Sequence, residues 1–364
     1  MNTELLFSSI QVGNLSLSNR IVMAPMTRVY SPDGVPGSNV AAYYRRRAEG
    51  GVGLIVTEGT AINHPSAVSH ANIPNIHEEA ALEGWKQVVE EVHAAGSKII
   101  PQLWHVGMAR TIGEGPNVEA LPIGPSGLNL AGEPVTEPLT TAEVESLVSA
   151  FAQAAANAKK VGFDGIEIHG AHGYLIDQFF WEGTNKRTDR YGGDLVGRTT
   201  FAVEVIEACR KAVGPDFPIV LRFSQWKLGA YDEKLAKNAD ELERFLTPLS
   251  DAGVDIFHCS TRRFSQPEFE GSELNLAGWT KKITGKPSIT VGSIGLHSDF
   301  FAEDSAQKTE DNINELLERM DREEFDLVAV GRALISDPAW PAKVQSGAID
   351  EIIPFTAEST KTLY

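Results

Sequence analysis

The stretch Asp164–Leu175, DGIEIHGAHGYL, decides the fold of this chain. Its first part, Asp164–Ile168, is a short apolar run that predicts a buried strand. Two histidines and a tyrosine follow where this strand ends, at His169, His172 and Tyr174. Imidazoles can hold a carbonyl or an oxyanion by hydrogen bonds, and a phenol can deliver a proton. The stretch therefore predicts a reaction centre at the end of a strand, suited to chemistry that places negative charge on a substrate oxygen.

Similar short apolar runs alternate with longer helical patterns along the chain. Helical spacing of apolar residues predicts amphipathic helices over Ala80–Ala95 and Thr141–Val161, the second with Thr140 and Thr141 as candidate N-caps. Such alternation with near-continuous apolar strands favours a parallel barrel over an open sheet. We therefore expect a (β/α)8 TIM barrel, in a single domain over residues 1–364. The eight predicted strands are Ile21–Met26, Gly53–Thr57, Lys98–Leu103, Gly165–His169, Ile219–Phe223, Asp255–Cys259, Ser288–Val291 and Asp326–Val330.

Three long connections, Trp104–Leu139, Gly170–Leu195 and Ser260–Glu273, each follow a strand rather than precede one. In a parallel barrel they all lie on the C-terminal face, where sites are built. The first connection follows the third strand and contains the turn-rich piece Pro122–Gly127, PIGPSG. We expect it to fold as a small cap over the barrel mouth.

Glycines and polar residues gather at the predicted strand ends. Strands seven and eight end in Gly292 and Gly331, and glycine lets backbone amides approach an anion closely, as a phosphate site needs. Arg332 is expected to clamp that phosphate. Gln102 can pair with an amide-like edge of a redox cofactor, and Arg222 can neutralise charge on a reduced ring. The alternatives are that the glycines only end strands and that Gln102 and Arg222 make internal hydrogen bonds.

Composition excludes several classes of protein. The chain has 364 residues, with 49 acidic against 32 basic side chains and a formal charge of −17, which repels nucleic acid and anionic membranes. No basic secretory start and no apolar run of membrane-spanning length is present, so we expect a cytoplasmic protein. Cys209 and Cys259 are interpreted as small buried residues, and no metal site is expected because His169 and His172 lack a third ligand.

Several motifs together resemble the FMN-dependent ene-reductases of the old yellow enzyme family, and the likeness runs nearly end to end. The His169–Phe180 stretch and the Tyr-Gly-Gly of Tyr191–Gly193 are the most specific of them. The full set is Asn19–Ile21, Ala24–Thr27, Tyr43–Ala48, Gln102–His105, His169–Phe180, Arg187–Gly193 and Gly331–Pro338.

The resemblance implies FMN on the C-terminal face of a barrel, reduced by NAD(P)H and reoxidised by the C=C bond of an α,β-unsaturated carbonyl compound. His169 and His172 resemble the pair that binds the substrate carbonyl, Tyr174 resembles the proton donor, and Trp104 resembles a residue that lines the substrate pocket. No Gly-x-Gly-x-x-Gly follows a strand, so nicotinamide is expected to use the same pocket, with ping-pong kinetics. The residues matching cofactor contacts are Pro25, Met26, Thr27, Gly59, Gln102, Arg222, Gly292, Ser293, Ile294, Gly331 and Arg332.

The sequence leaves alternative functions open, and it differs from the family pattern in places. A nitroester or nitroaromatic reductase on the same flavin site is the alternative, because nitro groups also place charge on oxygen, and the protein is expected to be a monomer or homodimer. Iron–sulfur relatives need four thiolates, and this chain has two cysteines. A lyase or aldolase would need a lysine at a strand end, and a flavin carrier without turnover is disfavoured by the intact trio.

Asn stands in some members where this chain has His172, and residues 299–311 form a longer, more charged insertion than expected. Glu167 is interpreted as an internal carboxylate, and packing in loops is the favoured interpretation of Asp177, Trp181, Trp226 and Tyr231.

Overall fold

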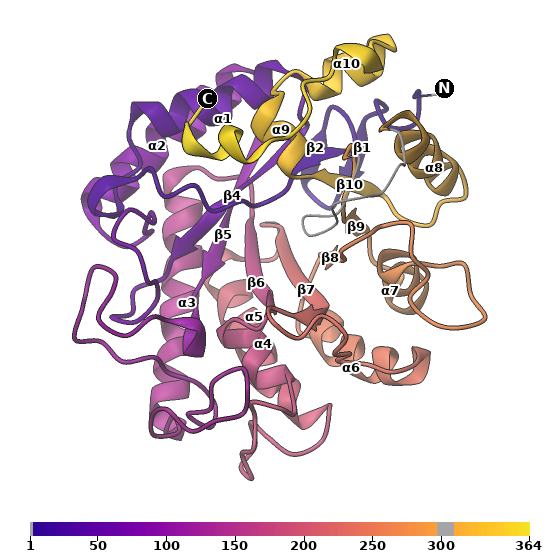
Figure 1. The fold of residues 1–364 in the computed structure, drawn as a ribbon. Helices are drawn as coiled ribbons and strands as arrows, with labels where there is room; N and C mark the ends of the chain where they lie inside the picture. The colour runs from indigo at the N-terminus through magenta and orange to yellow at the C-terminus, as the bar shows by residue number, and fades with distance from the viewer. Residues whose placement is uncertain (1–2, 297–308) are drawn as a thin grey trace.

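A closed barrel of eight parallel strands, ringed by helices, forms the centre of the computed structural model, which describes residues 3–296 and 309–364 (Figure 1). The strand order around the barrel is β10-β3-β4-β5-β6-β7-β8-β9, so the first and last barrel strands pair and close the ring. The predicted (β/α)8 TIM barrel is confirmed. The barrel strands are β3 (Ile21–Met23), β4 (Leu54–Ala61), β5 (Lys98–Trp104), β6 (Ile166–His172), β7 (Ile219–Lys227), β8 (Ile256–Ser260), β9 (Ser288–Val291) and β10 (Leu327–Val330).

Inward-facing side chains follow the two-residue period of a strand, and they change character along the barrel. In β5, Ile100 is followed two residues later by Gln102, and in β7 Val220 is followed by Arg222. The lower part of the interior is therefore apolar and the upper part is polar. The apolar cluster is Val12, Leu15, Leu17, Val22, Ala24, Leu54, Val56, Ile100, Val220, Ile256, Ile289, Leu327 and Ala329.

A short antiparallel hairpin, β1 (Ile10–Val12) and β2 (Leu15–Leu17), contributes three members of this cluster and so packs against the lower part of the barrel interior. The hairpin was not predicted, because three-residue strands carry too little periodicity to be recognised.

The predicted helices are confirmed at α2 (Glu79–Ala94) and α3 (Thr141–Val161). The Thr140 hydroxyl accepts a hydrogen bond from the Glu143 N–H at 3.3 Å, and the Glu143 carboxylate accepts from the Thr140 N–H at 2.7 Å, which forms a capping box. The other helices are α1 (Ser38–Glu49), α4 (Leu175–Phe180), α5 (Thr200–Val213), α6 (Ala239–Asp251), α7 (Leu276–Thr284), α8 (Thr309–Asp321), α9 (Arg332–Ser336) and α10 (Trp340–Ser346).

Several strand boundaries differ from the prediction. β3 ends at Met23 rather than at Met26, two residues before Pro25, which has no N–H to donate to a neighbouring strand. β6 runs on to His172 rather than His169, and β7 runs on to Lys227 rather than Phe223. The two strands lose register after Gly170 and pair again at His172 and Lys227. This late pairing carries the end of β6 further out on the C-terminal face than the sequence indicated.

The connection between β5 and α3 lies against the turn that follows β6. A Cβ placed on Gly173 would be 3.1 Å from the side chain of Leu130, and the Met108 N–H donates to Gln178 Oε1 at 3.0 Å. The expected cap thus reaches the His169–Tyr174 region. Most of the charged insertion, residues 299–308, lies outside the described residues. In the described part of the chain, no helix has the length and apolar character needed to cross a membrane.

Candidate functional site

The rings of the predicted trio lie together above the barrel. The ring centroid of His169 is 5.1 Å from that of Tyr174 and 5.2 Å from that of His172, both edge to face. Trp104, the last residue of β5, stacks on His169 at 6.2 Å and meets Tyr174 edge to face at 5.0 Å. One aromatic cluster therefore holds four residues that were predicted to lie in one strand and two connections.

A tight turn at Gly173 aims Tyr174 into this cluster. His172 and Gly173 have φ angles of 65° and 79°, a left-handed conformation that is unfavourable for a side chain such as that of His172. Both polar groups of the Gly173 residue are held: its N–H donates to Asp177 Oδ2 and its C=O accepts from Gln178 Nε2, each at 2.6 Å. The turn is therefore fixed from two sides by residues of α4.

Both imidazoles are neutral near pH 7. Burial lowers the pKa of His169 and of His172 well below the usual value, and the positive charge of Arg222 lowers both further. Nδ1 of His169 accepts a hydrogen bond from the Ala171 N–H at 3.3 Å, so the neutral ring carries its proton on Nε2. His172 Nε2 lies 2.7 Å from Ser260 Oγ. His169 therefore presents an N–H donor on the side away from the strand backbone.

A fully buried ion pair lies beneath the turn. Lys227 Nζ donates to Asp177 Oδ1 at 2.7 Å, and neither side chain is exposed. Lys227 ends β7 directly opposite His172 in the sheet register. Asp177 was predicted to lie in a loop, but it lies in α4. Lys227 had no predicted role, because fifty residues separate it from Asp177 in the sequence.

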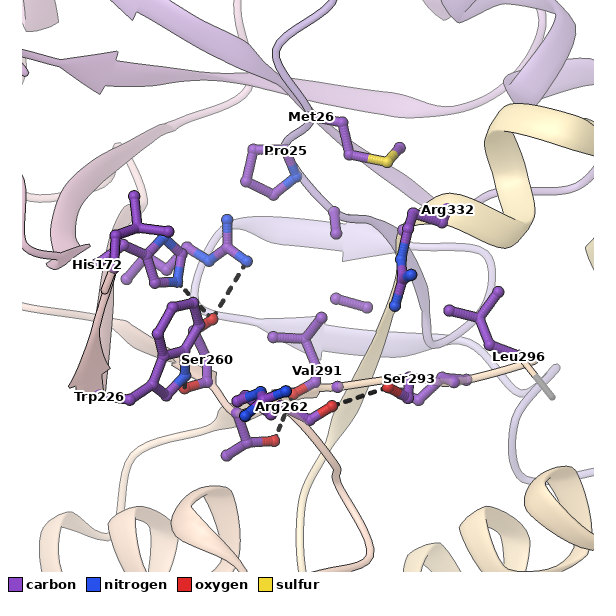
Figure 2. A pocket seen from close by; sticks show the side chains of 18 of the residues that line it. Pro25, Met26, His172, Trp226, Ser260, Arg262, Val291, Ser293, Leu296 and Arg332 are labelled. Carbon is purple, nitrogen blue, oxygen red and sulfur yellow. Dashed lines mark hydrogen bonds between the residues drawn. The ribbon is translucent and has the colours of Figure 1, made fainter. Parts of the chain in front are cut away.

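A cavity of about 370 Å³ opens beside the cluster on the C-terminal face. Figure 2 shows His172 and Trp226 at one end of it, Arg332 and Ser293 at the other, with Pro25 above. Eight of the predicted cofactor residues line this cavity, together with His172: Pro25, Met26, Arg222, Gly292, Ser293, Ile294, Gly331 and Arg332.

The other predicted residues lie outside the lining of this cavity. Thr27 is exposed, and Gln102 is buried inside the barrel. A Cβ on Gly59 would lie 2.3 Å from Cε3 of Trp104, so this glycine makes room for the indole ring. Position 292 also requires glycine to avoid a clash, because its φ is 152° and a Cβ would lie 2.6 Å from Thr261 Oγ1.

A polar layer underlies the cavity, and its centre is Glu167. Oε1 of Glu167 accepts from Gln102 Nε2 at 2.8 Å, and Oε2 accepts from His258 Nδ1 at 2.6 Å. Arg222 faces the same layer, and its Nε is buried with no hydrogen-bond partner among the residues described. Glu167 is thus an internal carboxylate with two donors, as expected.

Several residues that line the cavity were missed or assigned to packing. Trp226 lies in β7 rather than in a loop, stacks on His172 with ring centroids 4.6 Å apart, and lines the cavity. Tyr231 and Arg262 also line it, and the Arg262 guanidinium lies 4.8 Å above the Tyr231 ring. Ser260 could have been found from the period-two pattern of β8, which turns every second side chain inward.

Two further points concern the remaining site predictions. Trp181 lines a different, more polar cavity, of about 570 Å³, with Lys186 and Arg198. Within residues 3–296 and 309–364, no group of three or more His, Cys, Asp or Glu side chains is arranged to hold a metal ion.

Comparisons with known proteins place this geometry in a family. The sequence profile of the NADH:flavin oxidoreductase / NADH oxidase family matches residues 5–351. The chain is 36% identical over 358 residues to an NADH oxidase of Thermoanaerobacter brockii; the match covers 95% of this chain but spans only 52% of that relative's length. It is 34% identical over 348 residues to 12-oxophytodienoate reductase 7 of Oryza sativa subsp. japonica, covering 92% of this chain and 86% of the relative.

Solved structures agree with the sequence comparisons. Morphinone reductase in complex with tetrahydroNAD superposes with a TM-score of 0.81 at 30% identity, covering 98% of this chain and 93% of that one. The barrel and the grouped His169–Tyr174 residues had pointed to the same enzymes. The chain belongs to the NADH:flavin oxidoreductase / NADH oxidase family, the old yellow enzyme family, whose members are FMN-dependent NAD(P)H oxidoreductases.

Proposed function

We propose that this protein is a single-domain FMN-dependent NAD(P)H oxidoreductase that reduces the C=C bond of α,β-unsaturated carbonyl compounds. The observation that carries the proposal is the ring cluster, in which the rings of His172 and Tyr174 lie 5.2 Å and 5.1 Å from that of His169, beside an open cavity. FMN held in this cavity and reduced by NAD(P)H would supply the hydride for the alkene. The side chains of the protein itself would bind the substrate oxygen and deliver the proton.

The cavity fits an aromatic cofactor that carries a phosphate. Its volume of about 370 Å³ lies within the range of small-molecule sites. The Arg222 Nε–H is buried and unpaired among the described residues, which suits a group that accepts hydrogen bonds at this end. A Cβ on Gly331 would meet nothing closer than Met26 Sδ at 3.6 Å, so the backbone there is open to a phosphate, with Arg332 adjoining.

His169 and His172 are proposed to hold the carbonyl oxygen of the substrate. Because both rings are neutral, each carries one N–H, and His169 presents its own from Nε2. Negative charge that develops on the oxygen strengthens such hydrogen bonds, and one donor to an oxyanion is typically worth about 2.7–4 kcal/mol in the barrier. The two imidazoles therefore act by binding the reacting oxygen more tightly as it gains charge.

Tyr174 is proposed to deliver the proton to the substrate α-carbon. Burial raises the pKa of the Tyr174 phenol, so it is protonated at neutral pH and available as an acid. Its position depends on the Gly173 turn, where Asp177 and Gln178 hold the N–H and the C=O. A general acid in such a position contributes roughly 10²–10⁴-fold to the rate.

The test uses the purified protein loaded with FMN, NADPH as reductant and 2-cyclohexenone as acceptor. Tyr174→Phe should retain the flavin spectrum and its reduction by NADPH, while reoxidation by 2-cyclohexenone in stopped flow slows by roughly 10²-fold or more. Tyr364→Phe, at an exposed tyrosine, is the matched control and should leave both half-reactions unchanged.

Three outcomes would contradict the proposal. A colourless protein that takes up no FMN removes the cofactor. Unchanged reoxidation in Tyr174→Phe removes the proton donor. Turnover of nitroaromatics or nitroesters without any turnover of 2-cyclohexenone would assign the site to nitro reduction instead.

A further inference from the structure

The polar layer beneath the cavity has an arrangement that packing alone does not explain. An apolar cluster that includes Val56, Ile100 and Val220 fills the barrel interior on the hairpin side, and interior positions of a barrel are normally filled by branched apolar side chains. Replacing a buried charged network by apolar residues of similar size is often neutral or stabilising. Glu167, which is fully buried, therefore carries an energetic cost that the barrel itself does not require.

Glu167 determines which way the Gln102 amide faces. A carboxylate only accepts hydrogen bonds, so the contact at 2.8 Å must use the Gln102 NH₂ group, and Gln102 Oε1 is turned away from Glu167. On the other side, His258 must donate its Nδ1–H to Glu167 Oε2 at 2.6 Å. Gln102 therefore offers Oε1, a hydrogen-bond acceptor, on the side away from Glu167.

Glu167 also lies in the electrostatic field of Arg222. Arg222 pairs in register with His169 in β6 and with His258 in β8, and the Glu167 carboxylate raises the pKa of its guanidinium against the larger lowering by burial. The groups that surround Arg222 include the neutral imidazoles of His169, His172 and His258, the Tyr174 phenol and the Ser260 hydroxyl, 3.5 Å away. Glu167 is the anionic group that faces Arg222 in this layer.

We propose that Glu167 is a positioning residue for the cofactor: it orients Gln102, and its negative charge offsets that of Arg222, which limits how strongly the site favours reduced flavin. This inference rests on the proposed function, because it assigns Arg222 and Gln102 to the flavin side of the layer. A flavin gains negative charge on reduction, so a cation beside it favours the reduced form and an anion beneath it opposes that effect.

Two substitutions separate charge from geometry. Glu167→Gln removes the charge and keeps the size, so Arg222 acts without compensation. A single buried charge acting through an effective dielectric constant of about 20 changes an equilibrium constant by at least about tenfold. We expect the ratio of reduced to oxidised FMN at a fixed potential to rise about tenfold or more, and tenfold corresponds to about +30 mV in the midpoint potential of a two-electron couple. Glu167→Asp keeps the charge and shortens the reach, so the ratio should stay within about threefold while the flavin absorption spectrum shifts as Gln102 loosens.

The measurement is the midpoint potential of the holoenzyme, by equilibration with a redox dye, and not its activity. Asp216→Asn is the control: it removes one negative charge at an exposed position before β7, at the opposite end of the barrel, and should change the ratio less than twofold. A change below threefold in FMN-loaded Glu167→Gln overturns the proposal, and so does an equal change in Asp216→Asn. Failure of the wild-type protein to bind FMN would instead overturn the proposed function.

A second measurement covers the case in which Glu167→Gln does not fold. Infrared difference spectra of the wild-type holoenzyme, oxidised minus reduced, should contain a shifted carboxylate stretch that moves on labelling with ¹³C-glutamate and is altered in Glu167→Asp. Absence of any glutamate band, or a band unaltered in Glu167→Asp, would overturn the proposal.

Discussion

Breaking the buried pair of Lys227 and Asp177 is the sharpest test of how the site is built. Lys227→Met keeps the length of the side chain and removes its ammonium group. Asp177 Oδ2 still accepts from the Gly173 N–H, but Oδ1 loses its cation in a site with no exposed surface. Removing one partner of a buried ion pair typically costs about 3–5 kcal/mol. An unpaired Asp177 carboxylate would therefore cost a large share of the roughly 5–15 kcal/mol by which a folded protein is typically stable.

The loss should appear as a shift in melting temperature. An unfolding entropy of about 2.1 cal/mol/K per residue gives about 0.76 kcal/mol/K for 364 residues, so 3–5 kcal/mol lowers Tm by about 4–7 °C. The double variant Asp177→Asn with Lys227→Met removes both charges and retains an oxygen for the Gly173 N–H. It should recover most of the loss, because it leaves no unpaired charge.

The pH dependence has a definite sign. Burial raises the pKa of Asp177 even with Lys227 present, and without the ammonium group this pKa rises further. A carboxyl whose pKa is higher in the folded state binds protons more tightly there, so acidification stabilises the single variant relative to wild type. The deficit in Tm should therefore be smaller at pH 5.5 than at pH 8.

The assay is thermal unfolding with saturating FMN for wild type, Lys227→Met and the double variant. Lys160→Met, at an exposed position of α3, is the matched control and should stay within about 0.5 kcal/mol of wild type. A loss below 1 kcal/mol in Lys227→Met, or a double variant as unstable as the single one, would refute the reasoning.

Three further predictions concern other parts of the site. Combined His169→Ala and His172→Ala should weaken phenol binding to FMN-loaded protein by at least about tenfold, since a hydrogen bond to a charged oxygen contributes about 1.5–3 kcal/mol, and an unaltered titration of the flavin absorbance would contradict this. Burial raises the pKa of Glu58 to about 7, so the folded state binds this proton more tightly and loses stability as pH rises toward and through about 7. Glu58→Gln should remove about 3 kcal/mol of this loss between pH 4.5 and pH 8. A pH-independent difference between the variant and wild type in urea unfolding would count against this prediction. Gly59→Ala should cost about 1–3 kcal/mol in thermal unfolding and raise KM for 2-cyclohexenone, because its Cβ meets the Trp104 ring at 2.3 Å; an unchanged KM would show that Trp104 does not bound the substrate pocket.

Local patterns were enough to predict the repeating units of the fold. A strand buried on both faces is a continuous apolar run, and an amphipathic helix has its own spacing, so β9 and α3 match their predicted bounds. The His169–Tyr174 grouping was also predictable, because these three residues are neighbours in sequence and leave the barrel together at one strand end. Family resemblance then extended the prediction to the cofactor residues that line the cavity.

Contacts between distant strands could not be read from the chain. The positions of β6 and β7 beyond Gly170 depend on a register shift, and this shift brings Lys227 opposite His172. Glu167 and His258 are separated by ninety-one residues and meet because the sheet curves inward at β7, which lies between their strands. Short-range periodicity says which face a side chain occupies, whereas its partner across the barrel depends on strand order, stagger and closure. The residues that carry the proposed chemistry could thus be identified from the sequence. The hydrogen bonds and ion pairs that orient them and set their electrostatic surroundings depend on the closed barrel.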